Sequence, residues 1–145
     1  MTNKERPLPY LVMPGHLIRR LSQHSNQIFQ EEMKSAGFDV TSVQFAAMQT
    51  IELEREVEQS QIAAAIYYDK ATLGGVIDRM EKKGWVSRKQ SPKDKRARLV
   101  SLTTEGKAIL EQLTPIVESL QDKILKQLDE TERHQFVELA RKVLS

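Results

Sequence analysis

Apolar residues between Lys70 and Lys83 recur with the period of an α-helix. Asp69 stands at the N-cap position and Gly84 follows the last turn, so the sequence marks both ends of this helix. Polar side chains such as Arg79 fall on the opposite side. The apolar side consists of Leu73, Val76, Ile77 and Met80. The pattern therefore predicts an amphipathic helix with one buried face and one exposed face.

Shorter segments on either side of this helix complete a recognisable unit. Residues 61–66 predict a short helix with Ile62 and Ile66 facing inward, and residues 67–69 leave room only for a tight turn. This is the spacing of a helix-turn-helix. Residues 85–89 and 99–102 have strand character and flank a charged, turn-rich segment, which predicts a hairpin with a basic tip. A helix-turn-helix followed by such a hairpin is a winged helix.

Two adjacent glycines interrupt the helix from Lys70 to Lys83. Gly74 and Gly75 each cost roughly 1 kcal/mol relative to alanine in a helix interior. A cost of this kind indicates that another surface comes close to the helix. Tight packing against a second helix is one explanation. Close approach to a phosphate backbone or a base edge is the other, and the sequence favours it.

The remaining segments also predict helices. Residues 14–35 form one amphipathic pattern, and residues 42–54, which follow a capping box at Thr41, are apolar nearly all round and should be buried. Residues 52–58 are a charged link. Thr103 is the expected cap of a long helix in which Pro115 should produce a kink or a local break. A last helix should begin close to residues 129–132.

The predicted fold is mainly α with a small β-hairpin wing. The first helix and the last two have no obvious partner within a winged helix of this size, so a second copy of the chain should supply one. We therefore expect a homodimer. Residues 1–36 and 104–145 are the expected helical dimerisation region, and residues 37–103 the expected winged helix-turn-helix. Residues 1–13, with two prolines, predict an extended arm.

The composition is that of an ordinary soluble protein of 145 residues, with 39% hydrophobic and 29% charged residues. No apolar run reaches the ~18 residues that span a bilayer, and no signal-peptide pattern opens the chain. Cysteine is absent, which excludes disulfides, thiolate zinc sites and cysteine-based peroxide sensing. A cytoplasmic protein without membrane contacts is expected.

Positive charge is concentrated in one part of the chain. The formal net charge is only +2, but residues 60–107 hold 11 basic against 5 acidic side chains. Any one of these lysines could simply be solvated. The cluster nevertheless gathers at the predicted hairpin tip and helix end, which the fold would direct at one duplex.

Two motifs resemble those of the MarR (multiple antibiotic resistance regulator) family of winged-helix transcription factors. One is Leu99-x-x-Leu102-Thr103-x-x-Gly106 after the basic segment 94–98, and the other is the segment 78–84. The resemblance implies a dimeric DNA-binding regulator. Gly74-Gly75 replaces the polar or basic residues of many members and resembles a branch that responds to aromatic acids, such as hydroxycinnamates or benzoate-type compounds, some as coenzyme A thioesters. Glu58 stands where a Ser or Thr commonly caps the short helix that precedes the one from Lys70.

In this arrangement the helix from Lys70 enters the major groove, with Gly75 and Arg79 among the residues closest to base edges, while Arg96 reaches a minor groove. Asp94 is expected to orient Arg96 or Arg98. The dyad of a dimer implies an inverted-repeat operator. The candidate DNA-binding residues are Ser60, Gln61, Lys70, Ala71, Thr72, Gly74, Gly75, Arg79, Lys93, Asp94, Lys95, Arg96 and Arg98.

A second candidate site lies on the first helix. Arg20 could bind an aromatic carboxylate or its coenzyme A thioester beside an apolar slot, and Arg19, elsewhere on the helix, is the natural control. The expected effector-binding residues are Tyr10, as a lid, and His16, Leu17, Arg20, Leu21, His24 and Ser25. A polar seam between subunits remains an equal alternative. A shared metal is not expected, because His16 and His24 lie about 12 Å apart along the helix axis.

The sequence contains no phosphate-binding glycine loop, no nucleophile elbow and no zinc-type histidine pair. An enzyme is therefore not expected, and no cofactor is implied. The favoured interpretation is a repressor of aromatic-acid catabolism genes. A regulator of efflux or stress genes that responds to other lipophilic or phenolic compounds is the alternative. A dimeric interaction protein that does not bind nucleic acid remains a further one.

Overall fold

The computed structural model describes residues 9–145, and its helices and small sheet confirm the predicted fold class. A 3₁₀ turn, η1, precedes the first helix. The elements are η1 (Pro9–Val12), α1 (Pro14–Ala36), α2 (Ser42–Glu54), β1 (Glu56–Glu58), α3 (Gln59–Ala65), α4 (Lys70–Lys82), β2 (Val86–Gln90), β3 (Arg98–Leu102), α5 (Thr104–Ile124) and α6 (Glu130–Leu144).

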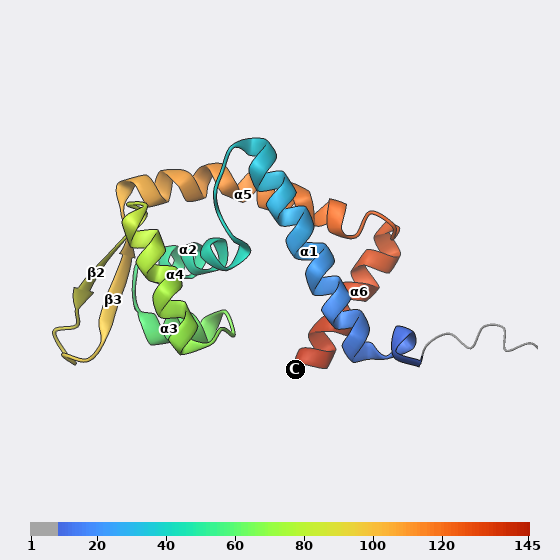
Figure 1. The fold of residues 1–145 in the computed structure, drawn as a ribbon, viewed down its shortest axis with the longest axis horizontal. Helices are drawn as coiled ribbons and strands as arrows, with labels where there is room; N and C mark the ends of the chain where they lie inside the picture. The colour runs from blue at the N-terminus through green and yellow to red at the C-terminus, as the bar shows by residue number, and fades with distance from the viewer. Residues whose placement is uncertain (1–8) are drawn as a thin grey trace, which may run out of the picture.

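The chain forms an arch. Helix α5 runs along the top, with the winged helix (α2 to α4 and the sheet) below one end and α1 and α6 below the other (Figure 1). Helix α1 packs across α5, and α2 packs against both α5 and β3. The winged helix is therefore connected to α1 chiefly by the packing of α2 on α5.

The core lies where α2, α4 and α5 meet the sheet. The apolar side of α4 predicted from the sequence is buried as expected: Leu73, Val76, Ile77 and Met80. Helix α2 buries Phe45, Met48 and Ile51, which confirms that it is central. Helix α2 contacts both α4 and α5, so it fixes the position of one relative to the other.

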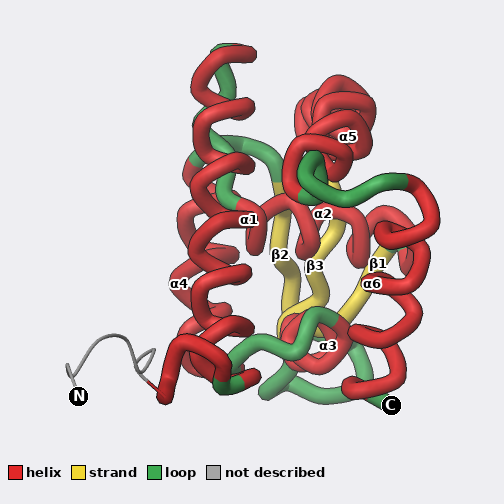
Figure 2. The backbone as a smooth tube through the Cα atoms, turned by 90° about the vertical axis from the view of Figure 1, so that its right-hand side faces the viewer, coloured by secondary structure: helices red, strands yellow, loops and turns green. Residues whose placement is uncertain are grey.

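The sheet has three antiparallel strands in the order β1-β3-β2, and Figure 2 shows them side by side. Val57 pairs with Val100, and Arg88 pairs with Val100 from the other side. Strand β1 lies where the sequence predicted only a charged link. It was missed because it has three residues and only one of them, Val57, is apolar, so no alternation is visible.

Helix α5 is continuous through Pro115, so the local break expected there is wrong. Proline removes one backbone hydrogen bond. Leu113 and Val117, one on either side of the proline, are buried and hold both halves of the helix against the core. The helix ends at Ile124, and Leu128 lies in the turn before α6.

The described part of the N-terminal arm also differs from the prediction. Residues 9–12 form one 3₁₀ turn rather than an extended segment, and residues 1–8 lie outside the described part of the chain. The first helix begins at Pro14 as predicted, with proline in its first turn. Within residues 9–145, no helix is long and apolar enough to cross a membrane.

The joint between the wing and α5 explains the Leu-Thr-x-x-Gly motif. The Thr103 hydroxyl donates to the Gly84 carbonyl at 2.6 Å and accepts from the Gly106 N–H at 2.9 Å. The Thr103 N–H donates to the Trp85 carbonyl at 3.0 Å. A Cβ on Gly106 would lie 2.0 Å from that same carbonyl oxygen, so only glycine fits. The motif locks the start of α5 to the base of the wing.

Candidate nucleic-acid interface

The exposed side of α4 is fixed at its N-terminus by Asp69. The Asp69 carboxylate accepts hydrogen bonds from the Thr72 N–H at 2.9 Å and the Thr72 hydroxyl at 2.7 Å. The hydroxyl bond lowers the pKa of Asp69 below its ordinary value, which favours the charged cap. Thr72 therefore has its hydroxyl proton committed to the cap and can offer DNA only lone pairs and its methyl group. Lys70, Ala71 and Arg79 are exposed on the same helix.

The two glycines of α4 have no close neighbour that would require them. A Cβ on Gly74 would lie 3.5 Å from the amide nitrogen of Gln59, and one on Gly75 would lie 3.6 Å from the Arg79 guanidinium. Both are ordinary van der Waals distances to flexible side chains. Tight packing against another described helix therefore does not explain the pair. Close approach of an external surface stays as the prediction for both positions.

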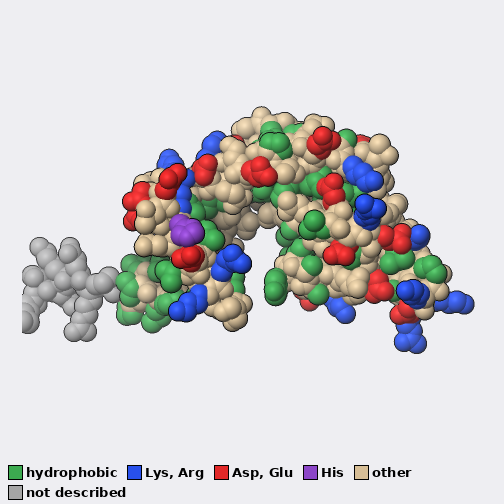
Figure 3. Space-filling view, turned by 180° about the vertical axis from the view of Figure 1, so that it is seen from behind, with side chains coloured by type: hydrophobic (Ala, Val, Ile, Leu, Met, Phe, Trp, Pro, Cys, Tyr) green, Lys and Arg blue, Asp and Glu red, His purple; other side chains and the backbone are tan. Residues whose placement is uncertain are grey.

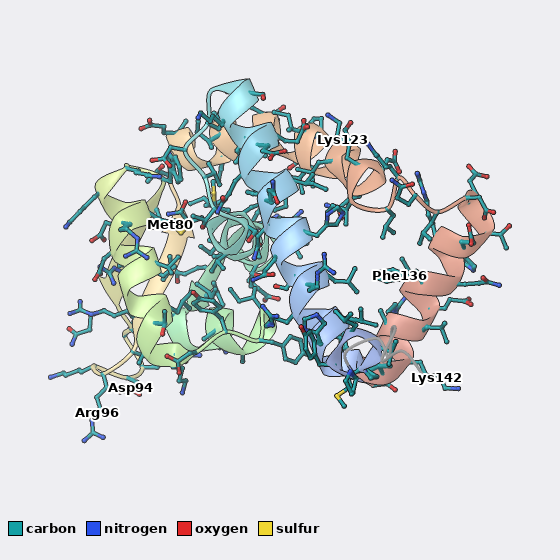
Figure 4. All side chains as sticks on the ribbon, turned by 45° about the vertical axis from the view of Figure 1, so that its right-hand side comes forward. Met80, Asp94, Arg96, Lys123, Phe136 and Lys142 are labelled. Atoms are coloured by element: carbon teal, nitrogen blue, oxygen red, sulfur yellow. The ribbon has the colours of Figure 1, made fainter. Side chains whose placement is uncertain are left out.

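The wing tip is held in shape by its own polar side chains. The buried Ser91 hydroxyl accepts from the N–H groups of Lys93, at 3.2 Å, and Asp94, at 3.4 Å. Asp94 in turn accepts from the Arg96 N–H at 2.9 Å. It thus orients Arg96 through the backbone, not through the guanidinium. Figure 4 shows the Arg96 side chain extending from the tip away from the protein.

A cleft of about 340 Å³ separates the wing from the start of α3 and α4. It brings together predicted residues that are distant in sequence. Ser60 and Lys70 line one side, and Asp94, Arg96 and Arg98 line the other. Gln61 lies just outside, and its side-chain oxygen accepts from the Glu58 N–H at 3.1 Å. Helix α3 therefore begins at Gln59, two residues earlier than predicted.

Three of the basic residues counted in this region are engaged within the protein. Lys83 forms an ion pair with Asp39 at 3.3 Å and lies over the Trp85 ring, 4.5 Å from its centre. Lys89 pairs with Glu56 at 3.0 Å. The third, Arg88, binds groups on both helices of the helix-turn-helix. All three belong to the basic cluster of residues 60–107, and only the tertiary structure reveals their partners.

The residues expected to bind the effector differ in the contacts they make. The rings of Tyr10 and His16 make an edge contact, with centroids 4.9 Å apart, and Arg19 lies 3.3 Å from the His16 ring nitrogen. The His24 ring approaches the carbonyl of Ile124 at 2.9 Å. Within residues 9–145, Arg20 has neither a hydrogen bond nor an ion pair. Leu17 and Leu21, on the same helix, are exposed.

Cavities flank α1 on two sides. One of about 340 Å³ lies between α1, α2 and α5 and includes Ser25, Phe29 and Phe45 in its lining. Another, of about 410 Å³, includes His24 and Lys123. His24 and Ser25 therefore line different cavities. Figure 3 shows an open notch between the winged helix and the lobe of α1 and α6. The residues described contain no cluster of three or more side chains suited to a metal.

Comparison with known proteins identifies the family. The MarR family model matches residues 40–97, which include the helix-turn-helix, β2 and the tip of the wing. The transcriptional regulator HosA of Escherichia coli O111:H- is 36% identical over 130 residues, covering 90% of this chain and 93% of HosA. The chain belongs to the MarR family. Members of this family are DNA-binding transcriptional regulators and not enzymes, and this MarR family protein is of the same kind.

Solved structures of MarR family proteins have the same fold. A cysteine-to-serine mutant of Escherichia coli MarR in complex with operator DNA has a TM-score of 0.84 and 31% identity, covering 96% of this chain and 99% of that one. Bordetella bronchiseptica BpsR, whose DNA binding is regulated by 6-hydroxynicotinic acid, has a TM-score of 0.86 and 29% identity, covering 96% and 98%.

Proposed function

We propose that the chain is a homodimeric repressor that binds an inverted-repeat operator and is released by an aromatic carboxylate or its coenzyme A thioester. The observation that carries the DNA-binding part is the cleft between the wing and α4. It brings Ser60, Lys70, Arg96 and Arg98 to one surface beside the half-buried glycines of α4. A protein that acts on operator DNA in this way would work in the cytoplasm.

On DNA, α4 lies in the major groove, with Gly74 and Gly75 allowing the helix to come close to the duplex and Arg79 reaching a base edge. Arg96 enters the adjacent minor groove from the wing tip. Ser60 and Gln61 at the start of α3 contact phosphate, as do Lys70 and the remaining wing cations, Lys93, Lys95 and Arg98.

The terminal helices support the dimer. Leu17, Ile18 and Leu21 of α1 are 41–58% exposed, and α6 buries none of its residues, leaving Val143 75% exposed. Apolar surface of this extent on the first and last helices is typical of an interface. Residues 1–36 and 104–145 therefore form the dimerisation region, with a winged helix of residues 37–103 on either side of the dyad.

The effector in this proposal is an aromatic acid. BpsR, which shares the fold over nearly the whole chain, responds to a heteroaromatic hydroxy acid. Arg20 offers a guanidinium without a partner among the described residues, beside the apolar side chains of Leu17 and Leu21, and Tyr10 is close enough to cover His16. The regulated genes would then encode the breakdown of such acids.

A second candidate function is regulation of efflux or stress genes in response to other lipophilic or phenolic compounds. The likeness to Escherichia coli MarR favours it as much as the likeness to BpsR favours the first. The two differ in what they require of the effector: a carboxylate needs Arg20, whereas a neutral phenol does not.

The test is release of operator DNA by a panel of aromatic acids, their thioesters and neutral phenols. Arg20→Ala should weaken the response to an acid about tenfold, equivalent to roughly 1.4 kcal/mol, without changing DNA affinity. Because Arg19 contacts His16, Lys34→Ala near the end of α1 is a cleaner control than Arg19→Ala. An effect of Arg19→Ala without one of Arg20→Ala would refute the site, and release by neutral phenols alone would favour the second function.

A further inference from the structure

Arg88 is the point at which the wing is joined to the helix-turn-helix. It lies on β2, yet its side chain crosses to α4, where it pairs with Asp78 and, at 3.2 Å, with Glu81. It also donates to the side-chain oxygen of Gln59, on α3, at 3.3 Å. One guanidinium thus holds both helices of the helix-turn-helix to the hairpin.

The environment of Arg88 is that of an internal group rather than a DNA contact. Its side chain is only 20% exposed, and Nη1, Nη2 and Nε all donate to protein oxygens. Hydrogen bonding to Glu81 raises the pKa of the guanidinium above its ordinary value. A phosphate could reach Arg88 only by displacing these partners.

The carboxylates that Arg88 binds stand among the cations of α4. Asp78 precedes Arg79 directly and lies four residues before Lys82, a spacing at which an acid and a base pair along a helix. In the part of the chain that the structure describes, neither Arg79 nor Lys82 forms an ion pair. Without Arg88, both carboxylates would repel the phosphate backbone and compete with it for these two cations.

We propose that Arg88 is a positioning residue for DNA binding: its guanidinium binds the carboxylates of Asp78 and Glu81 and so leaves Arg79 and Lys82 free for the duplex. This inference rests on the proposed DNA-binding function. It assigns to Arg88 a role that acts through α4, without contact to DNA. It also accounts for acidic residues on a helix face that approaches a polyanion.

The experiment compares the operator affinity of Arg88→Gln with that of the triple variant Arg88→Gln, Asp78→Asn, Glu81→Gln. Arg88→Gln should lose at least tenfold in affinity, because two carboxylates are left uncompensated. The triple variant should recover at least to within about threefold of wild type, since it lacks both carboxylates together with the guanidinium that binds them. Lys89→Gln is the matched control: it removes the same charge from the same strand, but its partner Glu56 lies on β1.

The salt dependence separates this role from a direct phosphate contact. The slope of log affinity against log salt should be the same for wild type and the triple variant. A triple variant that stays weak, with a slope about 0.9 smaller in magnitude, means that Arg88 itself neutralises a phosphate and overturns the proposal.

Thermal unfolding of every variant shows whether it is folded. If Arg88→Gln alone does not fold, the triple variant still decides the question: near wild-type affinity supports the proposal, and weak affinity refutes it. Failure of wild type itself to bind inverted-repeat DNA would refute the proposed function instead.

Discussion

Gly106 is the residue at which a single added carbon should do most damage. Its missing Cβ leaves room for the Trp85 carbonyl, which would otherwise lie 2.0 Å away. Gly106→Ala should therefore lower the free energy of unfolding by about 1–3 kcal/mol, as measured by chemical denaturation. Gly15→Ala is the control, because nothing lies within 4 Å of its added Cβ, and it should change stability by less than about 0.5 kcal/mol. An equal change in the free energy of unfolding for Gly106→Ala and Gly15→Ala would contradict the close packing of Gly106 against Trp85.

Gly75 should behave in the opposite way. An added Cβ meets only the end of Arg79 at 3.6 Å, so Gly75→Ala should stabilise the folded protein by roughly 1 kcal/mol through helix propensity. The same methyl should keep α4 away from DNA and reduce affinity at least tenfold. Thermal unfolding and DNA-binding anisotropy measure the two effects. Unchanged affinity would mean that DNA does not approach this glycine.

The roles of some individual residues could be predicted from the sequence, and the roles of others could not. The glycine pair and the basic wing could be recognised because their residue types are unusual for a helix interior and a loop. The role of Arg88 could not, since an arginine on a strand looks the same whether it faces DNA or two carboxylates. Its partners, Asp78 and Glu81, lie ten and seven residues away and meet it only after the hairpin has folded back on α4.

At the scale of elements, the wing tip should act as a preformed unit. Asp94→Ala removes the acceptor that orients the Arg96 backbone, so we expect operator affinity to fall about three- to tenfold, the equivalent of one hydrogen bond. Asp94→Asn keeps a side-chain oxygen and should restore most of the affinity. Because the tip is exposed, the unfolding temperature should barely change. Equal losses for the alanine and asparagine variants would indicate that the charge, not the hydrogen bond, matters.

Helices were predicted better than strands because their patterns are longer. The four apolar positions of α4 fix its face, and Asp69 and Gly84 place its ends to within one residue. Strand β1 offers only Val57 as an apolar signal. Helix α3 begins two residues before the predicted position because the Gln61 side chain accepts a hydrogen bond from the Glu58 N–H and caps the helix there. Of the kink or local break expected at Pro115, the break does not occur, because buried Leu113 and Val117 hold the helix against the core on both sides of the proline.

For the whole molecule, the exposed apolar sides of α1 and α6 lead to a prediction about assembly. Sedimentation equilibrium should show a dimer at micromolar concentration. Deleting residues 131–145 removes nearly all of α6, including Phe136, and should yield aggregates or unfolded monomer, because the proposed dimer interface would lose one of its helices. Arg141→Ala, at the exposed end of the same helix, should leave the dimer intact. A folded, stable monomer of the full chain would contradict this architecture.

The effector site is the part that the sequence specifies least. The sequence singles out Arg20 as a cation beside apolar residues, but His24 and Ser25 face different cavities. In a dimer, the surroundings of Arg20 depend on the second subunit, whose position one chain does not encode locally. The DNA-binding surface is different, because each winged helix is complete within one chain.

The most direct test of the central claim is to select operator duplexes from random DNA with the purified protein and to footprint the selected sites over a range of salt. The account predicts an inverted repeat whose half-site centres lie about one helical turn, roughly 10 bp, apart. It also predicts a loss of about 10³ or more in affinity between 50 and 200 mM salt. A footprint without two-fold symmetry, or an affinity that hardly responds to salt, would contradict it.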